Sequence, residues 1–138
     1  RVRFPKLCGL MSTIIRSVIS AGKITTAFGR PLHVPRDQAY IGTNYLIQGT
    51  AAEILKRGQV RVHDYLEEAT GGEMKILLPI HDELIIECPR KMLGHAKEIL
   101  RGVTHLMVDF PGKFRVPLAV ETQIATYDWA HKEEYSLA

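Results

Sequence analysis

Residues 74–88 read Met-Lys-Ile-Leu-Leu-Pro-Ile-His-Asp-Glu-Leu-Ile-Ile-Glu-Cys, and this stretch decides the fold. It contains two short apolar runs, rich in β-branched residues, on either side of three consecutive polar residues. Such a pattern predicts a β-hairpin, and Pro89 ends the second run because proline cannot donate to a strand ladder. We therefore expect His81, Asp82 and Glu83 to stand at an exposed turn between two rigid strands.

The rest of the chain alternates helical and strand-like patterns around this hairpin. Apolar residues recur at helical spacing from Pro5, which suits a first helical position, to Gly22, which suits a helix end. The expected elements are helices over 5–21, 37–69 and 91–107, and strands over 23–28, 32–34, 74–80, 84–88 and 115–125. This order predicts one α+β unit in which long helices pack on a small antiparallel sheet.

The composition is that of a globular chain, with 138 residues of which 46% are hydrophobic and 24% charged. Its longest uncharged stretches fall short of the roughly 18 apolar residues that a membrane span needs, and no signal peptide is recognisable. Cys8 and Cys88 show neither metal-ligand spacing nor a disulfide framework, which fits a reducing compartment. Because the first residue is Arg1, we expect the chain to be a fragment of something longer.

Positive charge is concentrated in the first quarter of the chain. Residues 1–36 contain seven basic side chains and no acidic one, whereas the remaining residues hold eleven basic and fifteen acidic side chains. A one-sided basic segment suits contact with phosphates, because each neutralised phosphate releases condensed counterions. A solvated basic helix without a partner explains the charge equally well.

Adjacent carboxylates at the hairpin turn suggest metal-dependent phosphoryl chemistry. Asp82 and Glu83, together with a carboxylate from another segment, could hold two divalent ions about 3.5–4 Å apart. Mg²⁺ suits such a site because it takes one or two carboxylates and completes its shell with water and substrate phosphates. The alternative, favoured when the hairpin is considered alone, is that both residues are ordinary polar turn residues.

A helical segment, residues 44–53, carries a second candidate group. Asn44 and Gln48 lie four residues apart and therefore share a helix face. Their amides could reach the minor-groove acceptors that every base pair presents, a contact that senses pair shape without reading sequence. Gly49 permits close approach by a ligand or another backbone, although glycine in a helix is also common in plain packing. The alternative is an ordinary helix with two solvent-facing amides.

Four segments of this sequence carry a resemblance to one enzyme family. They are Asn44-x-x-Ile47-Gln48-Gly49-Thr50-Ala51-Ala52-Glu53-x-x-Lys56; Ile80-His81-Asp82-Glu83-Leu84; Phe4-Pro5-Lys6 with Thr25-x-x-Phe28-Gly29-Arg30-x-x-x-Val34-Pro35; and Val116-Pro117-Leu118-x-Val120-Glu121 with Asp128-Trp129. In order and at compatible spacing, they resemble the C-terminal palm region of family A DNA polymerases, of the bacterial DNA polymerase I type, and the resemblance leaves a phage-encoded origin open. The match covers nearly the whole chain.

The resemblance implies a DNA-directed DNA polymerase that adds deoxynucleotides to a primer 3′ end by two-metal phosphoryl transfer, in DNA replication or repair. Asp82 and Glu83 would be the catalytic, Mg²⁺-binding carboxylates, with Glu83 in the supporting role. The implied DNA-binding residues are His81 at the primer end, Asn44 and Gln48 in the minor groove, and Arg30 and Thr25 beside the template.

The resemblance also implies an organisation and a set of partners. Residues 1–36 would join the fingers to the palm, and residues 37–138 would form the C-terminal palm subdomain. The partners would be primer–template DNA, deoxynucleoside triphosphates and the remainder of the polymerase, on the same chain or a separate one, with no membrane. The location would be the cytoplasm of a bacterium or of a phage-infected host.

The sequence departs from the family pattern at several positions. Tyr40 stands where the family usually has Arg, and it cannot bridge phosphate and groove as a guanidinium does. Glu53 replaces the usual Asp, and Pro31-Leu32 replaces a longer basic run. No acidic residue precedes Asp37, so the family's first catalytic Asp has no candidate here. The two Mg²⁺ ions would share a carboxylate absent from this chain, and we expect these residues alone not to polymerise.

Two other functions fit parts of the sequence. A catalytically silent DNA-binding or assembly module would need only the basic segment and the amide face. An HD-type metal phosphohydrolase would use a His-Asp dipeptide, either His81-Asp82 or His63-Asp64, with further His and Asp ligands. That fold is all-helical, however, and His81-Asp82 lies between strand-like runs.

Overall fold

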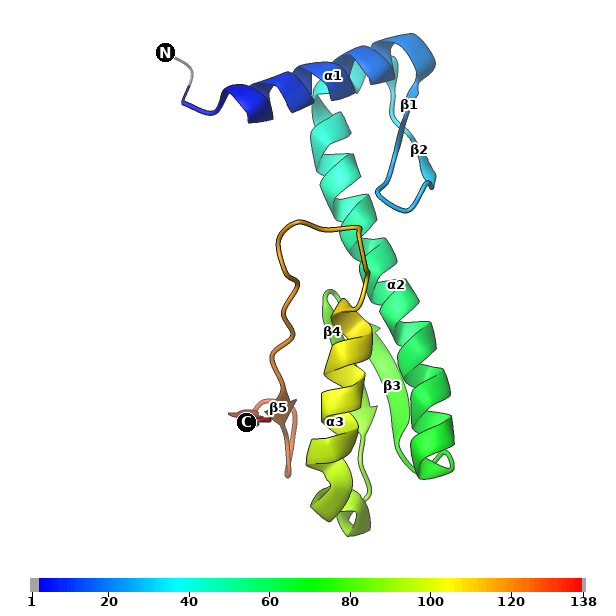
Figure 1. Ribbon diagram of the computed structural model, residues 1–138, viewed down its shortest axis with the longest axis vertical. Helices are drawn as coiled ribbons and strands as arrows, with labels where there is room; N and C mark the ends of the chain where they lie inside the picture. Colours follow the sequence, from blue (N-terminus) through cyan, green and yellow to red (C-terminus); the bar gives the residue numbers. More distant parts are fainter. Residues whose placement is uncertain (1–2, 138) are drawn as a thin grey trace. The chain divides into compact units, whose positions relative to one another are not determined.

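Helix α1 (Pro5–Ala21) opens the part of the chain that this computed structural model describes, residues 3–137 (Figure 1). Proline stands in its first turn, where a missing N–H costs no hydrogen bond. The helix ends at Gly22, whose φ of 67° is a left-handed conformation that glycine adopts without steric cost. Both boundaries agree with those expected from the sequence.

Two compact units make up the chain, Arg1–Glu53 and Ile54–Ala138. Helix α2 (Gly42–Thr70) contributes residues to both of them. The sequence led us to expect one unit with a single sheet. The described residues instead form three separate two-stranded antiparallel sheets, so the α+β class is confirmed and the single sheet is not. The expected boundary after residue 36 concerned polymerase subdomains and stays a prediction.

The first unit packs α1 against a small hairpin and a 3₁₀ segment. Strands β1 (Lys23–Thr25) and β2 (Pro31–His33) pair antiparallel, with Ile24 opposite Leu32. The 3₁₀ segment η1 (Arg36–Ile41) then leads into α2. The buried core of this unit consists of Ile14, Val18, Ile24, Val34 and Ala39.

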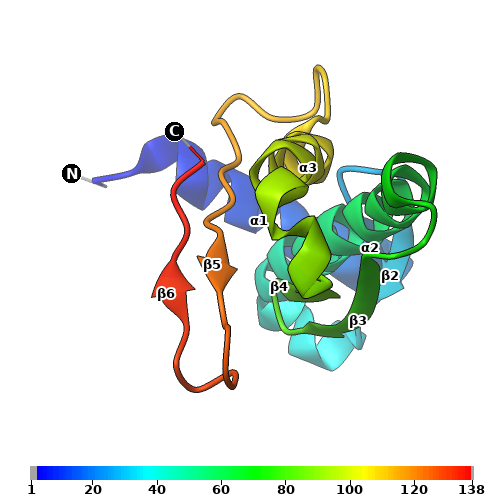
Figure 2. The ribbon, with the colours of Figure 1, turned by 90° about the horizontal axis from the view of Figure 1, so that it is seen from below.

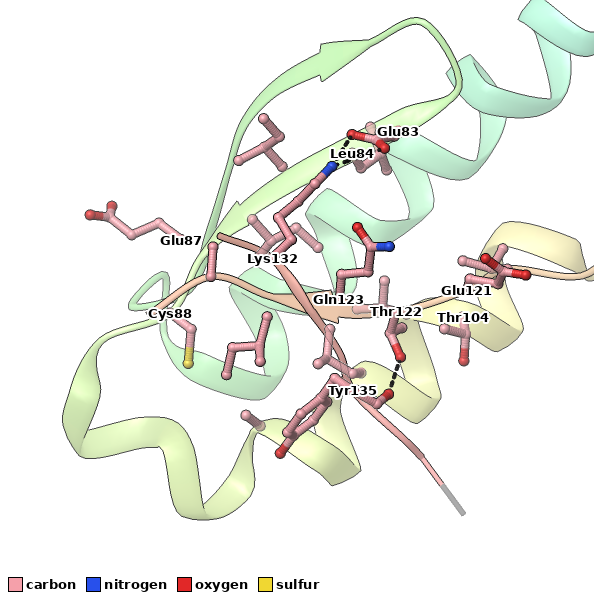
Figure 3. A pocket seen from close by; sticks show the side chains of 18 of the residues that line it. Glu83, Leu84, Glu87, Cys88, Thr104, Glu121, Thr122, Gln123, Lys132 and Tyr135 are labelled. Atoms are coloured by element: carbon pink, nitrogen blue, oxygen red, sulfur yellow. Dashed lines mark hydrogen bonds and ion pairs between the residues drawn. The ribbon is translucent and has the colours of Figure 1, made fainter. Parts of the chain in front are cut away.

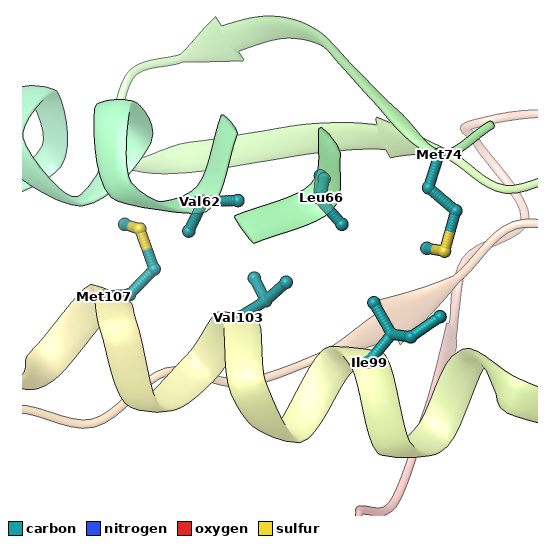
Figure 4. Packing of buried hydrophobic residues seen from close by; sticks show 6 residues of the cluster. All are labelled: Val62, Leu66, Met74, Ile99, Val103 and Met107. Atoms are coloured by element: carbon teal, nitrogen blue, oxygen red, sulfur yellow. The ribbon is translucent and has the colours of Figure 1, made fainter. Parts of the chain in front are cut away.

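The second unit is built on two helices that approach closely, α2 and α3 (Leu93–Val108). Glycines permit this approach, because a Cβ on Gly58 would lie 2.5 Å from the Met107 sulfur and one on Gly102 would collide with the Tyr65 ring. The core of the unit, shown in Figure 4, consists of Val62, Leu66, Met74, Ile99, Val103 and Met107.

A β-hairpin packs on this core, as the sequence predicts. Strands β3 (Lys75–Ile80) and β4 (Glu83–Glu87) pair antiparallel, with an irregularity in register between Ile76 and Leu78. Leu84 and Ile86 of β4 are partly buried against the core. After the short 3₁₀ turn η2 (Arg90–Met92), α3 begins. The core thereby fixes the strands while leaving their connecting turn exposed.

The C-terminal segment differs from the expected strand over 115–125. Only β5 (Gln123–Ile124) is a strand there, and it pairs with β6 (Glu133–Glu134), as Figure 2 shows. Pro111 and Pro117 lack N–H donors, which disfavours a continuous ladder upstream of β5. The apolar alternation over 116–120 therefore led us to predict a strand that is too long. Within residues 3–137, no helix combines the length and the apolar character that crossing a membrane would require.

Candidate active site

The turn of the β3–β4 hairpin holds the predicted catalytic group. Ile80 pairs with Glu83, so His81 and Asp82 alone form the connection between the strands. His81 has a φ of 52°, in the left-handed region where an L residue costs about 1–2 kcal/mol. Two-residue hairpin turns usually place Gly, Asn or Asp at such a position. A histidine kept there against its backbone preference marks the turn as a candidate site.

The two carboxylates beside His81 have different surroundings. Asp82 is exposed, and no described residue makes a hydrogen bond or ion pair with it. Glu83 is engaged, because the Lys132 Nζ lies 3.3 Å from each of its carboxylate oxygens. Figure 3 shows Lys132 reaching Glu83 from the C-terminal segment. The hairpin turn therefore presents one open carboxylate and one that is already paired.

A cavity of about 860 Å³ lies beside the hairpin in the second unit. Its lining comes from β4, from α3 and from the C-terminal hairpin, and includes Asp82, Glu83, Cys88 and Lys132. Burial raises the pKa of the Cys88 thiol above its usual value, because the cavity wall disfavours the charged thiolate. A smaller share of the Cys88 thiol is therefore in the reactive thiolate form.

The donor set at the turn is incomplete for a metal ion. Among the residues that the structure describes, no group of three or more His, Cys, Asp or Glu side chains could hold a metal ion. Mg²⁺ nevertheless needs only one or two carboxylates when substrate phosphates and water complete its shell. Asp82, open and fixed by two strands, has the donor chemistry of one such ligand. Further ligands have to come from outside the described residues.

The second predicted group lies in the first unit. Asn44 and Gln48 are exposed on α2, as a groove contact would require. Gly49 beside them faces the β1–β2 hairpin, because a Cβ there would lie 2.5 Å from the Leu32 Cδ1 and 3.5 Å from the Thr26 Cγ2. In this structure Gly49 therefore lets a hairpin pack on a helix. Of the two roles expected for it, this is plain packing and not the approach of a ligand.

The residues predicted to lie beside the template are in that same hairpin. Thr25 and Arg30 are both exposed. The turn is closed by buried Thr26, whose N–H donates to the Arg30 oxygen at 2.9 Å and whose Oγ1 accepts from the Arg30 N–H at 3.1 Å. The Ala27 N–H in turn donates to the Thr50 Oγ1 at 3.4 Å. Thr25, Arg30, Asn44 and Gln48 thus belong to one connected unit.

Two departures from the family pattern have structural consequences. Tyr40 lies in η1 and not in α2, and 71% of its surface is exposed. It therefore precedes the helix on which we expected it to stand. Glu53 is only 8% exposed, and its Oε2 has no hydrogen-bond partner among the described residues.

The His63-Asp64 dipeptide is exposed on α2 within an α+β unit, which gives no support to the HD-type alternative.

Sequence reasoning missed the basic residue of the hairpin site. Lys132 is 49 positions from Glu83, and no local pattern connects the two. Its Nζ also lies 4.7 Å from the centre of the Trp129 ring, a cation–π arrangement. The sole signal in the sequence was the Asp128-Trp129 pair, which we assigned only to the chain's terminal segment.

The family model for DNA polymerase family A matches residues 1–131. The chain belongs to this family.

The curated relatives are bacterial DNA polymerases I. The enzyme of Pseudomonas aeruginosa is 30% identical over 140 residues, which cover 94% of this chain and 15% of the relative. The thermostable enzyme of Thermus aquaticus is 32% identical over 145 residues, which cover 95% of this chain and 16% of the relative. That of Thermus thermophilus is 31% identical, with the same coverage. The chain therefore spans about 15% of the length of these relatives.

Proposed function

We propose that this chain is the C-terminal palm part of a DNA-directed DNA polymerase. The observation that carries the proposal is the hairpin turn, where an open Asp82 carboxylate follows a histidine in a left-handed conformation. Family membership over residues 1–131 supports the same function. The reaction is the attack of a primer 3′-hydroxyl on the α-phosphate of a deoxynucleoside triphosphate, with release of pyrophosphate.

Asp82 supplies the fixed negative charge of the site, and Glu83 is the supporting carboxylate. Mg²⁺, when bound, stabilises charge on the attacking and leaving oxygens of the displacement. The paired strands fix the backbone on either side of Asp82, so the carboxylate is anchored at the end of the hairpin. His81, at the same turn, contacts the primer end. A further carboxylate from another part of the polymerase completes the metal site.

The first unit holds the primer–template duplex. Its six described basic residues before Asp37 are all exposed: Arg3, Lys6, Arg16, Lys23, Arg30 and Arg36. Each phosphate that they neutralise lowers the slope of log K against log salt by about 0.9. Asn44 and Gln48 contact minor-groove acceptors, while Arg30 and Thr25 lie by the template backbone. Every base pair presents acceptors in the minor groove, so amide contacts to these acceptors do not require a particular sequence.

The chain needs the remainder of a polymerase in order to act. No acidic residue precedes Asp37, so no second palm carboxylate is available on that side. In this proposal the assembled enzyme binds primer–template DNA and deoxynucleoside triphosphates. It works in the cytoplasm of a bacterium or of a phage-infected host.

The test is replacement of the matched region of the Thermus aquaticus enzyme by this chain. We expect the chimera to extend a primer, whereas the purified 138-residue chain binds duplex DNA in a salt-dependent manner and extends nothing. A chimera that binds primer–template without extending it would favour the silent DNA-binding module. Extension by the purified chain alone would refute the need for a second carboxylate.

A further inference from the structure

The C-terminal hairpin reaches the candidate active site through one side chain. The Lys132 Nζ lies 3.3 Å from both Glu83 Oε1 and Glu83 Oε2, so a single ammonium faces both carboxylate oxygens (Figure 3). The Lys132 side chain is 27% exposed, and that of Glu83 is 48% exposed. The ion pair is thus partly shielded from water on the lysine side. It compensates one of two adjacent negative charges at the turn.

Lys132 is held in this position by its own loop. The Trp129 ring lies under the ammonium at 4.7 Å. Before it, Asp128 Oδ1 accepts from the His131 N–H at 3.0 Å and lies 2.7 Å from the His131 Nδ1. These contacts tighten the turn that immediately precedes Lys132.

The strand after Lys132 is anchored at its other end. The Tyr135 N–H donates to the Thr122 oxygen at 2.9 Å, which continues the β5–β6 pairing. The Arg101 Nε on α3 donates to the Leu137 oxygen at 2.9 Å. The C-terminal hairpin is therefore attached to α3 at one end and to the catalytic hairpin at the other. Lys132 forms the second of these attachments.

We propose that Lys132 is a positioning residue that holds Glu83 and competes with a metal ion for its carboxylate. This inference rests on the proposed function. With both Glu83 oxygens facing the ammonium, a divalent ion would have to displace Lys132 in order to use Glu83. Within residues 3–137, no basic side chain pairs with Asp82. The adjacent carboxylates thereby take different roles, one binding and one structural.

The proposal predicts a gain of metal affinity when the lysine charge is removed. Lys132→Gln frees Glu83 and leaves two uncompensated carboxylates at the turn. Exposed ion pairs of this kind change equilibria by about 1.4- to 5-fold, so we expect the half-saturating Mg²⁺ concentration to fall by about two- to fivefold. Lys132→Arg, which keeps the charge, should retain the wild-type value. Adding Glu83→Gln to Lys132→Gln should remove the gain.

The experiment is a Mg²⁺ titration of the ¹⁵N-labelled 138-residue chain, followed by NMR at the Asp82 and Glu83 amides. The sequence has one tryptophan, so the indole N–H of Trp129 gives a single signal that reports on Lys132 without any metal. Lys132→Gln and Glu83→Gln should each shift that signal. Lys91→Gln, which breaks the 2.6 Å pair with Glu73, is the matched lysine control and should alter neither readout.

The outcomes separate the proposal from the function on which it rests. If Asp82→Asn leaves the wild-type titration unchanged, the proposed metal site itself is wrong. If Asp82→Asn weakens binding but Lys132→Gln does not tighten it, the positioning role of Lys132 is wrong and the site stands. Tighter binding in Lys132→Gln that persists in the double variant would also overturn the proposal, because Glu83 would not be the group released.

Discussion

Replacing Leu66 by Ala tests whether the core of the second unit holds the β3–β4 hairpin in place. Leu66 is 1% exposed and packs among Val62, Met74 and Ile99, with Leu84 of β4 against the same cluster. Truncating a fully buried leucine costs about 2–5 kcal/mol, since the cavity adds to the lost transfer free energy. The dense α2–α3 contact leaves little room for collapse. We therefore expect a loss of about 3–4 kcal/mol.

This loss is large for a unit of this size. Native stability is about 0.05–0.15 kcal/mol per residue, so a unit of about 85 residues has roughly 4–13 kcal/mol. Each kcal/mol shifts the Tm of such a unit by about 4–8 °C. The variant should therefore melt at least about 12 °C lower, and its hairpin amides should exchange faster.

The assay is urea unfolding followed by circular dichroism, together with hydrogen exchange at β3 and β4. Leu77→Ala is the matched control, because Leu77 is 54% exposed on β3. Its cost should stay within about 0.5 kcal/mol. Equal losses in the two variants, or a loss below about 1 kcal/mol for Leu66→Ala, would refute the assignment of the core.

Further predictions concern the first unit, the thiols and the turn. Gly49→Ala should destabilise the chain by up to about 2 kcal/mol in urea unfolding, because overpacking against Leu32 costs about 1–3 kcal/mol and helix propensity returns up to about 1. Cys88 should react with iodoacetamide at pH 8 more slowly than exposed Cys8, since its raised pKa leaves less thiolate; mass spectrometry gives both rates. His81→Gly should unfold at a higher urea concentration than His81→Ala, because only glycine adopts the φ of 52° without steric cost.

Patterns of short range predicted much of the fold. The hairpin, helix α1 and the ends of α3 follow from apolar periodicity, proline and glycine, which act on neighbouring residues. The exposure of Asp82 follows in the same way from its place at a two-residue turn. These features depend on sequence separations of a few residues, and the structure confirms them.

Features set by distant contacts could not be predicted from one sequence. The partner of Glu83 is 49 residues away, and nothing near Lys132 indicates it. Within the strand expected over 115–125, only β5 has a partner strand. Alternating apolar residues upstream of β5 did not suffice to form a strand, because a strand needs a hydrogen-bonded neighbour. Apolar spacing predicted a helix over 37–69 that would include Tyr40, whereas Tyr40 lies in the 3₁₀ segment that precedes α2. In each case a tertiary contact, present or missing, outweighed the local pattern.

Primer extension by the chimera with the Thermus aquaticus enzyme tests the central role of Asp82 most directly. Asp82→Asn keeps the shape of the side chain and removes its charge, and Asp64→Asn on exposed α2 is the matched control. Changes one shell away from a metal already cost about 10–100-fold, so we expect Asp82→Asn to slow extension by at least about 100-fold. Asp64→Asn should stay close to the unaltered chimera, and primer–template binding should persist in both variants. Unchanged extension with Asp82→Asn would contradict the account.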